Sequence, residues 1–276
     1  MKRKAKTRIP AKINLTLDVY PAENGYHQIK SLVASINLFD AITLYRRKDN
    51  LVTLTEKGLK AGCEQEKNNA VKCYRYLMKE YNLSGVDIVI NKKIPVGAGL
   101  GGSSADVAGV ILSAEKLFRI KIDYKKTADA FGSDVMYMLI GGYAVISGRG
   151  NDVERVNLKK TLYLNVVDNI DGVSALDSYA MFDELKIKSN SATEKALKAI
   201  KEKSGFYKYI SNDLTKGSVK LMPNIQNAIN ILKLADGKTM TGSGSAVIGV
   251  YDNPSKRNLE YLILNKTKKI YKLKTI

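Results

Sequence analysis

Cysteine and histidine are scarce in this 276-residue sequence, and their scarcity excludes two kinds of stabilising site. Cys63 and Cys73 have no CxxC spacing, and His27 is the only histidine. A disulfide framework or a zinc site needs more of these side chains. The chain is 45% hydrophobic, which is enough for a core of its own. We therefore expect a reducing, cytoplasmic setting.

Long hydrophobic runs are also missing. A membrane helix needs about 18 consecutive apolar residues, and no such run occurs. The N-terminus MKRKAKTRIPAKINL is basic but lacks the apolar core of a signal peptide. We expect neither a signal peptide nor a membrane partner.

Acidic residues are few, with 27 Asp and Glu against 45 Lys and Arg, and the net charge is +18. The lysines are scattered, as at Lys57, Lys125 and Lys198, and no block of basic and aromatic residues of the RNA-binding type occurs. We interpret the charge as a solvated, lysine-rich surface and expect no nucleic-acid partner. The alternative is a polyanion-binding face on a basic nucleotide- or nucleic-acid-binding protein.

Strand and helix patterns alternate irregularly along the chain. Alternating apolar residues predict strands at 41–45, 51–55, 86–90, 143–148, 162–168 and 246–252. Helical spacing predicts helices at 68–81, 103–119, 195–203 and 224–234. This mixture favours an α+β fold. The polar segment GRGNDVERVNLKK predicts a boundary between two domains, at 1–155 and 156–276.

The segment IPVGAGLGGSSA, residues 94–105, is a glycine-rich loop between a predicted strand and a predicted helix. A Walker loop is excluded because Ser103, Ser104 and Ala105 follow Gly102 where lysine and Ser/Thr are required. A dinucleotide loop is formally possible, but NKKIP separates the strand from the glycines. The remaining hypothesis is a loop whose backbone N–H groups hold a triphosphate at a helix N-terminus. Ser103 and Ser104 could cap the helix, bind phosphate or bind Mg²⁺.

PVGAGLGGSSA resembles the second motif of the GHMP kinases, a family of ATP-dependent small-molecule kinases. Five other segments occur in the order seen in the branch of this family that phosphorylates 4-diphosphocytidyl-2-C-methyl-D-erythritol. They are PAKINL (10–15), NGYHQIKSLV (24–33), FGSDVMYMLIGG (131–142), NDL (212–214) and TGSGSAVIGV (241–250). The resemblance covers essentially the whole chain. It implies a two-domain GHMP kinase fold with the active site in the interdomain cleft.

The resemblance implies that Asp134 is the catalytic carboxylate and Lys12 its electrostatic partner. A carboxylate can take the proton of the attacking hydroxyl while a lysine stabilises developing negative charge. From the residues alone, Asp134 could equally be a helix cap and Lys12 a surface lysine.

The resemblance also implies binding residues. Asn14, Tyr26, His27 and Tyr179 would contact the acceptor, with the two tyrosines on either side of a cytosine, although His27 could be structural and Tyr179 a core residue. Gly242 and Ser243, in a third motif, would close over the substrates, or form an ordinary β-turn. ATP would be bound by Asn68, otherwise a helix N-cap, and by Pro95, Val96, Gly97, Ala98, Gly99, Leu100, Gly101, Gly102, Ser103, Ser104 and Ala105.

Five positions depart from the family pattern. Ser103 replaces a glycine, Ala105 a serine and Ser245 a proline, Val107 follows Asp106, and Val33 stands where an aromatic residue commonly encloses the cytidine. The resemblance implies a kinase that uses ATP and Mg²⁺, with no magnesium ligand or oligomeric state assigned. Another GHMP kinase, for homoserine, mevalonate or a sugar, or a diverged paralogue, is the alternative.

Overall fold

The computed structural model describes residues 3–23, 25–168 and 172–276, which divide into two compact units. The first unit contains residues 3–11, 38–96 and 101–140, and the second contains residues 12–37, 97–100 and 141–276. Strands β1 (Lys4–Asn14) and β3 (Tyr26–Arg46) each have one part in either unit. The predicted division at residue 155 groups the chain differently and stays a prediction.

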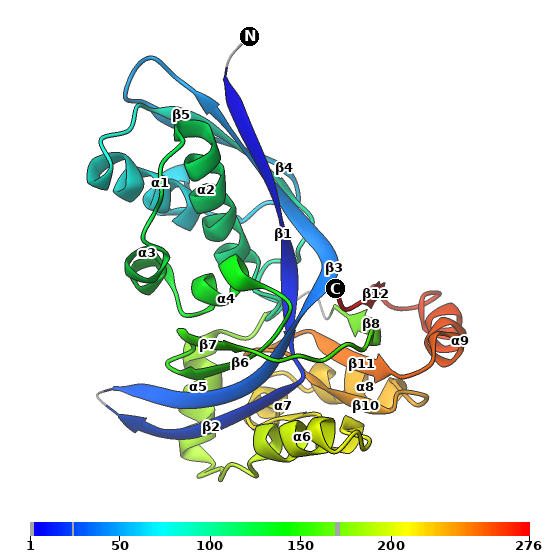
Figure 1. Ribbon diagram of the computed structural model, residues 1–276. Helices are drawn as coiled ribbons and strands as arrows, with labels where there is room; N and C mark the ends of the chain where they lie inside the picture. Colours follow the sequence, from blue (N-terminus) through cyan, green and yellow to red (C-terminus); the bar gives the residue numbers. More distant parts are fainter. Residues whose placement is uncertain (1–2, 24, 169–171) are drawn as a thin grey trace. The chain divides into compact units, whose positions relative to one another are not determined.

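The first unit contains helices and part of an eight-stranded mixed sheet (Figure 1). Strand β5 (Val86–Lys92) pairs antiparallel with the end of β3 and parallel with β4 (Val52–Gly58). Helix α2 contacts α1 and α4, and α3 contacts α4. The helices are α1 (Asn69–Glu80), α2 (Gly102–Phe118), α3 (Tyr124–Phe131) and α4 (Asp134–Ile140), with a 3-10 turn, η1, at Gln65–Lys67.

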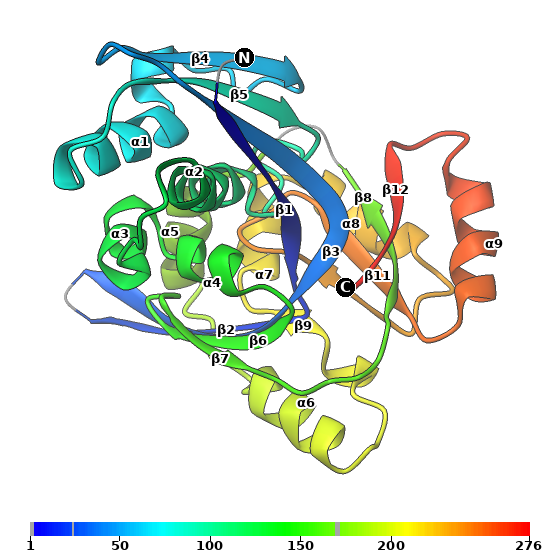
Figure 2. The same cartoon turned by 45° about the horizontal axis from the view of Figure 1, so that its top comes forward.

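The second unit contains the beginning of β3, which pairs with β2 (Thr16–Glu23) and β6 (Tyr143–Gly148). β7 (Asp152–Arg155) pairs with β6, and β9 (Ser211–Asn212) pairs with β2. An antiparallel sheet follows in the order β10 (Gly237–Met240), β11 (Val247–Tyr251), β8 (Tyr163–Val167) and β12 (Ile270–Lys274). Figure 2 shows α9 (Pro254–Leu264) beside β12.

The remaining helices of the second unit enclose its core. They are α5 (Ala175–Glu184), α6 (Ala192–Lys201), α7 (Thr215–Leu221) and α8 (Asn224–Ile231), with a 3-10 turn, η2, at Tyr207–Tyr209. One apolar cluster buries Val167 of β8, Phe182 of α5, Leu214 just before α7, and Ile225 of α8. Helices α5 and α7 pack against each other, and the hydroxyls of Ser178 and Ser218 both donate to Ser243 O.

The mixed α+β class is confirmed, and each predicted helix and strand matches an element of the structure. Most ends differ by a few residues, but the strand predicted at 41–45 is only the last part of β3, which begins at Tyr26. Within the three described stretches, no helix combines the length and hydropathy needed to cross a bilayer. Asn24, in the motif that contains Tyr26 and His27, lies outside the described residues.

Candidate active site

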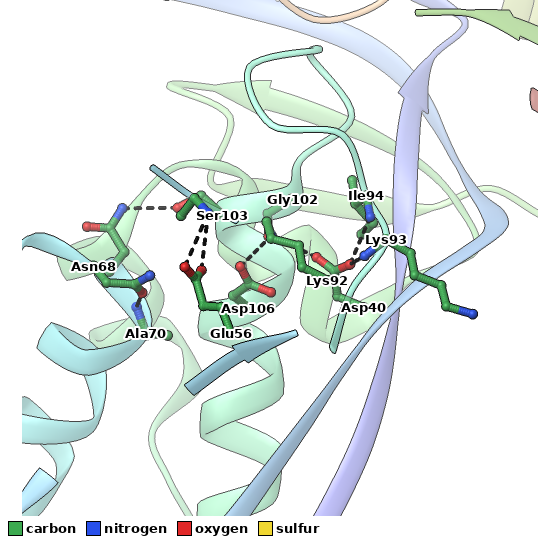
Figure 3. A network of polar contacts seen from close by, with 12 residues as sticks. Asp40, Glu56, Asn68, Ala70, Lys92, Lys93, Ile94, Gly102, Ser103 and Asp106 are labelled. Atoms are coloured by element: carbon green, nitrogen blue, oxygen red, sulfur yellow. Dashed lines mark hydrogen bonds and ion pairs between the residues drawn. The ribbon is translucent and has the colours of Figure 1, made fainter. Parts of the chain in front are cut away.

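A buried lysine joins three segments of the first unit (Figure 3). Lys92, at the end of β5, donates from Nζ to Asp40 Oδ2 at 2.8 Å and to Asp106 Oδ2 at 2.5 Å. Asp40 Oδ1 accepts from the N–H groups of Lys93 and Ile94, at 2.6 and 2.8 Å. The lysine therefore ties β3 and the segment leading to the glycine loop to the beginning of α2.

This network and its burial shift the pKa of the Asp106 carboxyl. Burial raises its pKa to about 7, and the negative charge of Asp40 acts in the same direction, against the lowering effect of Lys92. Asp106 Oδ1 has no hydrogen-bond partner in the described part of the chain. Burial alone would lower the pKa of Lys92, but the two carboxylates outweigh it and raise that pKa. Burial and the charge of Asp40 therefore favour the protonated form of Asp106.

The first turn of α2 offers backbone N–H groups to an anion. Its N-cap is Gly101, which has no side chain with which to cap them and has a φ of 74°. The first turn of any α-helix leaves N–H groups unpaired and carries the positive end of the helix dipole. Ser103 is exposed and its Oγ accepts from Asn69 Nδ2 at 3.1 Å. This turn therefore has the electrostatics of a phosphate-binding site.

Asp134 belongs to the same unit as this turn. It is the first residue of α4, which packs against α2, and it is partly exposed. A Cβ added at Gly132 would lie 3.9 Å from Ser104 Oγ, so the chain reaches α4 beside the first turn of α2. The structure thus brings the predicted base close in the fold to the predicted phosphate-binding serines.

Lys12 is buried in the second unit, next to Asn14. Lys12 Nζ donates to Asn14 Oδ1 at 2.7 Å, and the Lys12 backbone N–H donates to Leu100 O at 3.1 Å. Asn14 Oδ1 also accepts from the N–H of Gly242 at 3.1 Å, and its Nδ2 donates to Ser31 Oγ at 2.8 Å. Lys12 is therefore fixed to both the glycine loop and the third motif.

The glycine loop and the third motif touch through their backbones. A Cβ at Gly99 would lie 2.1 Å from Thr241 O, and one at Gly242 would lie 2.8 Å from Gly99 O. The Ala246 N–H donates to Ala98 O at 3.3 Å. Side chains at these glycines would force the two turns apart, so the close approach requires glycine.

Aromatic rings gather around His27 in the second unit. The imidazole stacks on Tyr179, with 5.1 Å between centroids, and meets Phe182 edge-on at 5.6 Å. His27 Nδ1 donates to Tyr20 O at 2.8 Å, and Nε2 lies 3.2 Å from Asp183 Oδ2. The histidine therefore has a fixed orientation within an aromatic surface.

Tyr26, the residue before His27, is 54% exposed. The Arg149 guanidinium lies 3.5 Å from the centroid of its ring, which is a cation–π contact. This contact holds one face of the phenol ring.

Comparison with known proteins identifies the family of this arrangement. The sequence model of the GHMP kinases N terminal domain matches residues 68–142, and that of the GHMP kinases C terminal domain matches residues 191–269. A 4-diphosphocytidyl-2-C-methyl-D-erythritol kinase of Clostridium botulinum is 32% identical, over 89% of this chain and 90% of its own. One of Thermoanaerobacter pseudethanolicus is 33% identical, over 94% and 91%. The chain belongs to the GHMP kinase family.

Solved structures agree. A crystal structure of 4-(cytidine 5'-diphospho)-2C-methyl-D-erythritol kinase has a TM-score of 0.83 and 25% identity, and covers 98% of this chain and 99% of its own. Mevalonate kinase of L. major has a TM-score of 0.79 at 12% identity, covers 100% of this chain and 97% of its own, and supports the fold alone. As a GHMP kinase the chain is an ATP-dependent enzyme, which confirms the predicted family, fold and kinase activity.

The predicted ATP-binding residues are divided between the units. Asn68, Pro95, Val96 and Gly101 to Ala105 lie in the first, and Gly97 to Leu100 lie in the second. Asn68 caps α1, because its Oδ1 accepts from the Ala70 N–H at 2.9 Å. Its role in binding ATP stays a prediction, and so do the roles of the other site residues and the location of the site in an interdomain cleft.

The five departures from the family pattern lie in different environments. Ser103 is exposed and accepts a hydrogen bond from Asn69, whereas the other four are buried: Val33, Ala105, Val107 and Ser245. A hydroxyl at Ala105 would need a buried partner of its own. Val33 packs in the core, so it cannot present a surface to an acceptor.

Sequence analysis missed Lys92 and its two carboxylate partners. The signal was present, because the alternation in VDIVINK puts Lys92 on the same buried face as Ile88 and Ile90. A lysine on a buried face requires acidic partners. Asp40 lies 52 positions away, and no local pattern pointed to it.

Proposed function

We propose that this GHMP kinase transfers the γ-phosphoryl group of ATP to the 2-hydroxyl of 4-diphosphocytidyl-2-C-methyl-D-erythritol. The observation that carries the proposal is the aromatic surface of His27, Tyr179 and Phe182, because homoserine, mevalonate and sugars have no planar base to stack on it. The relatives named for this kinase match nearly the whole chain, which supports the same acceptor.

The glycine loop and the first turn of α2 are suited to the phosphates of ATP. Gly97, Gly99 and Gly101 all have positive φ, and close backbone contacts leave no room for a side chain at Gly99. The uncapped N–H groups of α2 supply hydrogen bonds and a positive dipole to an anion. Ser103 and Ser104 present their hydroxyls in the same turn.

Asp134 acts as the base in this proposal. Its carboxylate accepts the proton of the acceptor hydroxyl as the oxygen bonds to the γ-phosphorus and the bond to the β-phosphate oxygen breaks. The ammonium of Lys12, oriented by Asn14, stabilises the negative charge that develops on the transferred group. Most of the rate enhancement comes from this positioning and charge stabilisation.

Magnesium is the predicted cofactor, and the donor set is compatible with it. No cluster of three His, Cys, Asp or Glu side chains able to hold a metal ion occurs among the residues described. Mg²⁺ in kinases is bound mainly by substrate phosphates and water, with one or two protein oxygens. The hydroxyls of Ser103 and Ser104 are the candidates, and Mg²⁺ would neutralise phosphate charge during transfer.

A panel of acceptors tests the proposal. ADP release is measured with Mg-ATP and either the cytidine compound, homoserine, mevalonate or galactose. Turnover with the cytidine compound at a kcat/KM at least a hundredfold above the others is the expected result. Turnover with another acceptor alone would overturn the acceptor assignment and leave the family assignment in place. The cytoplasmic location and the lack of a nucleic-acid partner stay predictions.

A further inference from the structure

We infer that Asn212 is a positioning residue for phosphoryl transfer, which acts by holding the peptide at Gly242 against the glycine loop. The inference rests on the proposed function and adds a residue to its machinery. Asn212 lies on β9, is buried, and belongs to the motif NDL, which has so far had no role in the site.

The amide of Asn212 is fully engaged with the third motif. Its Nδ2 donates to Gly242 O at 2.7 Å and to Met240 O at 2.9 Å. Its Oδ1 accepts from the Leu214 N–H at 2.9 Å, which fixes the side chain and identifies the nitrogen that faces the turn. Both donor hydrogens therefore hold the backbone on either side of Thr241.

The peptide groups of Gly242 are held from two directions. Asn14 Oδ1 accepts from the Gly242 N–H, and Asn212 Nδ2 donates to the Gly242 carbonyl. The next carbonyl, that of Ser243, has other donors in the hydroxyls of Ser178 and Ser218. The position of Gly242 therefore depends on the two asparagines.

The position of the turn at Gly242 matters for catalysis because of the groups that it contacts. Gly242 lies against Gly99, where a Cβ added at Gly242 would be only 2.8 Å from Gly99 O. Asn14, the partner of Asn212 in holding the turn, is also the hydrogen-bond acceptor of Lys12 Nζ. A shift of Gly242 would disturb both the glycine loop and the orientation of Lys12. Displacements of about 1 Å at such positions can cost about a hundredfold in rate.

A matched control separates positioning from general stability. Asn165 is also a buried asparagine of the second unit, and its Nδ2 donates two hydrogen bonds, to Tyr251 Oη at 3.1 Å and to Arg257 O at 3.0 Å. Neither partner belongs to the glycine loop or the third motif. Asn165→Ala therefore removes a similar pair of buried bonds and leaves Gly242 untouched.

The experiment compares Asn212→Ala with Asn165→Ala by three readouts: steady-state kinetics, ATP affinity by calorimetry, and amide hydrogen exchange at Gly242 and Gly244. The Gly244 N–H donates to Thr241 O at 3.1 Å, so it reports the closure of the turn. We expect Asn212→Ala to lower kcat at least tenfold, to keep the acceptor KM within threefold, and to speed exchange at both amides at least tenfold. Asn165→Ala should keep kcat within twofold and leave both exchange rates unchanged.

Equal kcat values and equal exchange rates in the two variants would overturn the inference. If Asn212→Ala does not fold, Asn212→Asp keeps the Oδ1 acceptor and puts a second oxygen in place of Nδ2, facing the carbonyls of Gly242 and Met240, and is expected to loosen the turn in the same way. A double mutant with Asn14→Ser should show non-additive losses, because both side chains act through Gly242. If the wild type does not turn over the cytidine compound, the proposed acceptor fails, while exchange and ATP affinity still test the role of Asn212.

Discussion

Replacement of Asp106 by asparagine should change how the stability of this enzyme depends on pH. Asp106 is 4% exposed, and its pKa is raised from 3.8 to about 7 by burial and by Asp40, in spite of the ion pair with Lys92. In the unfolded chain the carboxyl loses its proton near its ordinary pKa of about 3.9. Between these two values the folded protein holds a proton that the unfolded chain does not.

The sign and size of the effect follow from this difference. The folded state binds more protons between about pH 4 and about pH 7, so the wild type loses stability as the pH rises through this window. One pKa unit corresponds to about 1.4 kcal/mol, so the whole change amounts to about 4 kcal/mol. Asparagine cannot titrate. The free energy of unfolding of Asp106→Asn minus that of the wild type should therefore increase by about 4 kcal/mol between about pH 4 and about pH 8.

Urea denaturation of both proteins at several pH values measures this difference directly. Asp49→Asn is a control of opposite sign, because the hydrogen bond from Arg47 lowers the pKa of Asp49. Asp49 contributes stability above its ordinary pKa, and this contribution is lost as the pH falls through its lower folded value. The stability of that variant relative to the wild type should therefore fall as the pH rises toward about 4 and stay constant between about pH 4 and about pH 8. A difference for Asp106→Asn that stays constant or falls with pH would show that Lys92 keeps Asp106 ionised, and would refute the reasoning.

Three further substitutions, and one control, test the site. Asp134→Asn should lower kcat by about a hundredfold or more and keep the affinity for ATP within threefold, because only the base is lost. Stopped-flow kinetics measures the rate and calorimetry the ATP affinity. A kcat near the wild-type value would show that Asp134 is not the base. Gly99→Ala should destabilise the protein by about 2–4 kcal/mol, since its Cβ would lie 2.1 Å from Thr241 O. Thermal unfolding measures this loss, with Gly205→Ala as the control. A Cβ at Gly205 would have no atom within 4 Å, so that variant should keep nearly the wild-type stability. His27→Ala should raise the KM of the cytidine acceptor about tenfold and leave the KM of ATP unchanged; equal changes in both would contradict a role in acceptor binding.

Local patterns predicted the elements that position the phosphate-binding turn. The alternation at 86–90 and the helical spacing after Gly102 locate β5 and α2 because both periodicities are short-range. The repeated glycines of the loop also predicted a close backbone approach, to an anion or to another turn, because only glycine has no side chain to prevent it.

The hydrogen-bond network behind those elements could not be predicted in the same way. Asn14 is predicted to contact the acceptor, and this stays a prediction; the sequence did not indicate that its side chain also bonds Lys12, Ser31 and the Gly242 N–H. The last contact spans 228 positions, and Asn212 reaches the same turn across 30. Such pairings arise from the tertiary fold, and one sequence contains no periodic signal for them.

The position of the new phosphate tests the central claim most directly. The wild type is incubated with Mg-ATP and 4-diphosphocytidyl-2-C-methyl-D-erythritol, and the product is examined by phosphorus NMR and mass spectrometry, with Asp134→Asn alongside. We expect one equivalent of ADP and a single new phosphomonoester at the 2-hydroxyl, formed at least about a hundredfold more slowly by the variant. Phosphate at another hydroxyl, or ATP hydrolysis without a phosphorylated product, would contradict it.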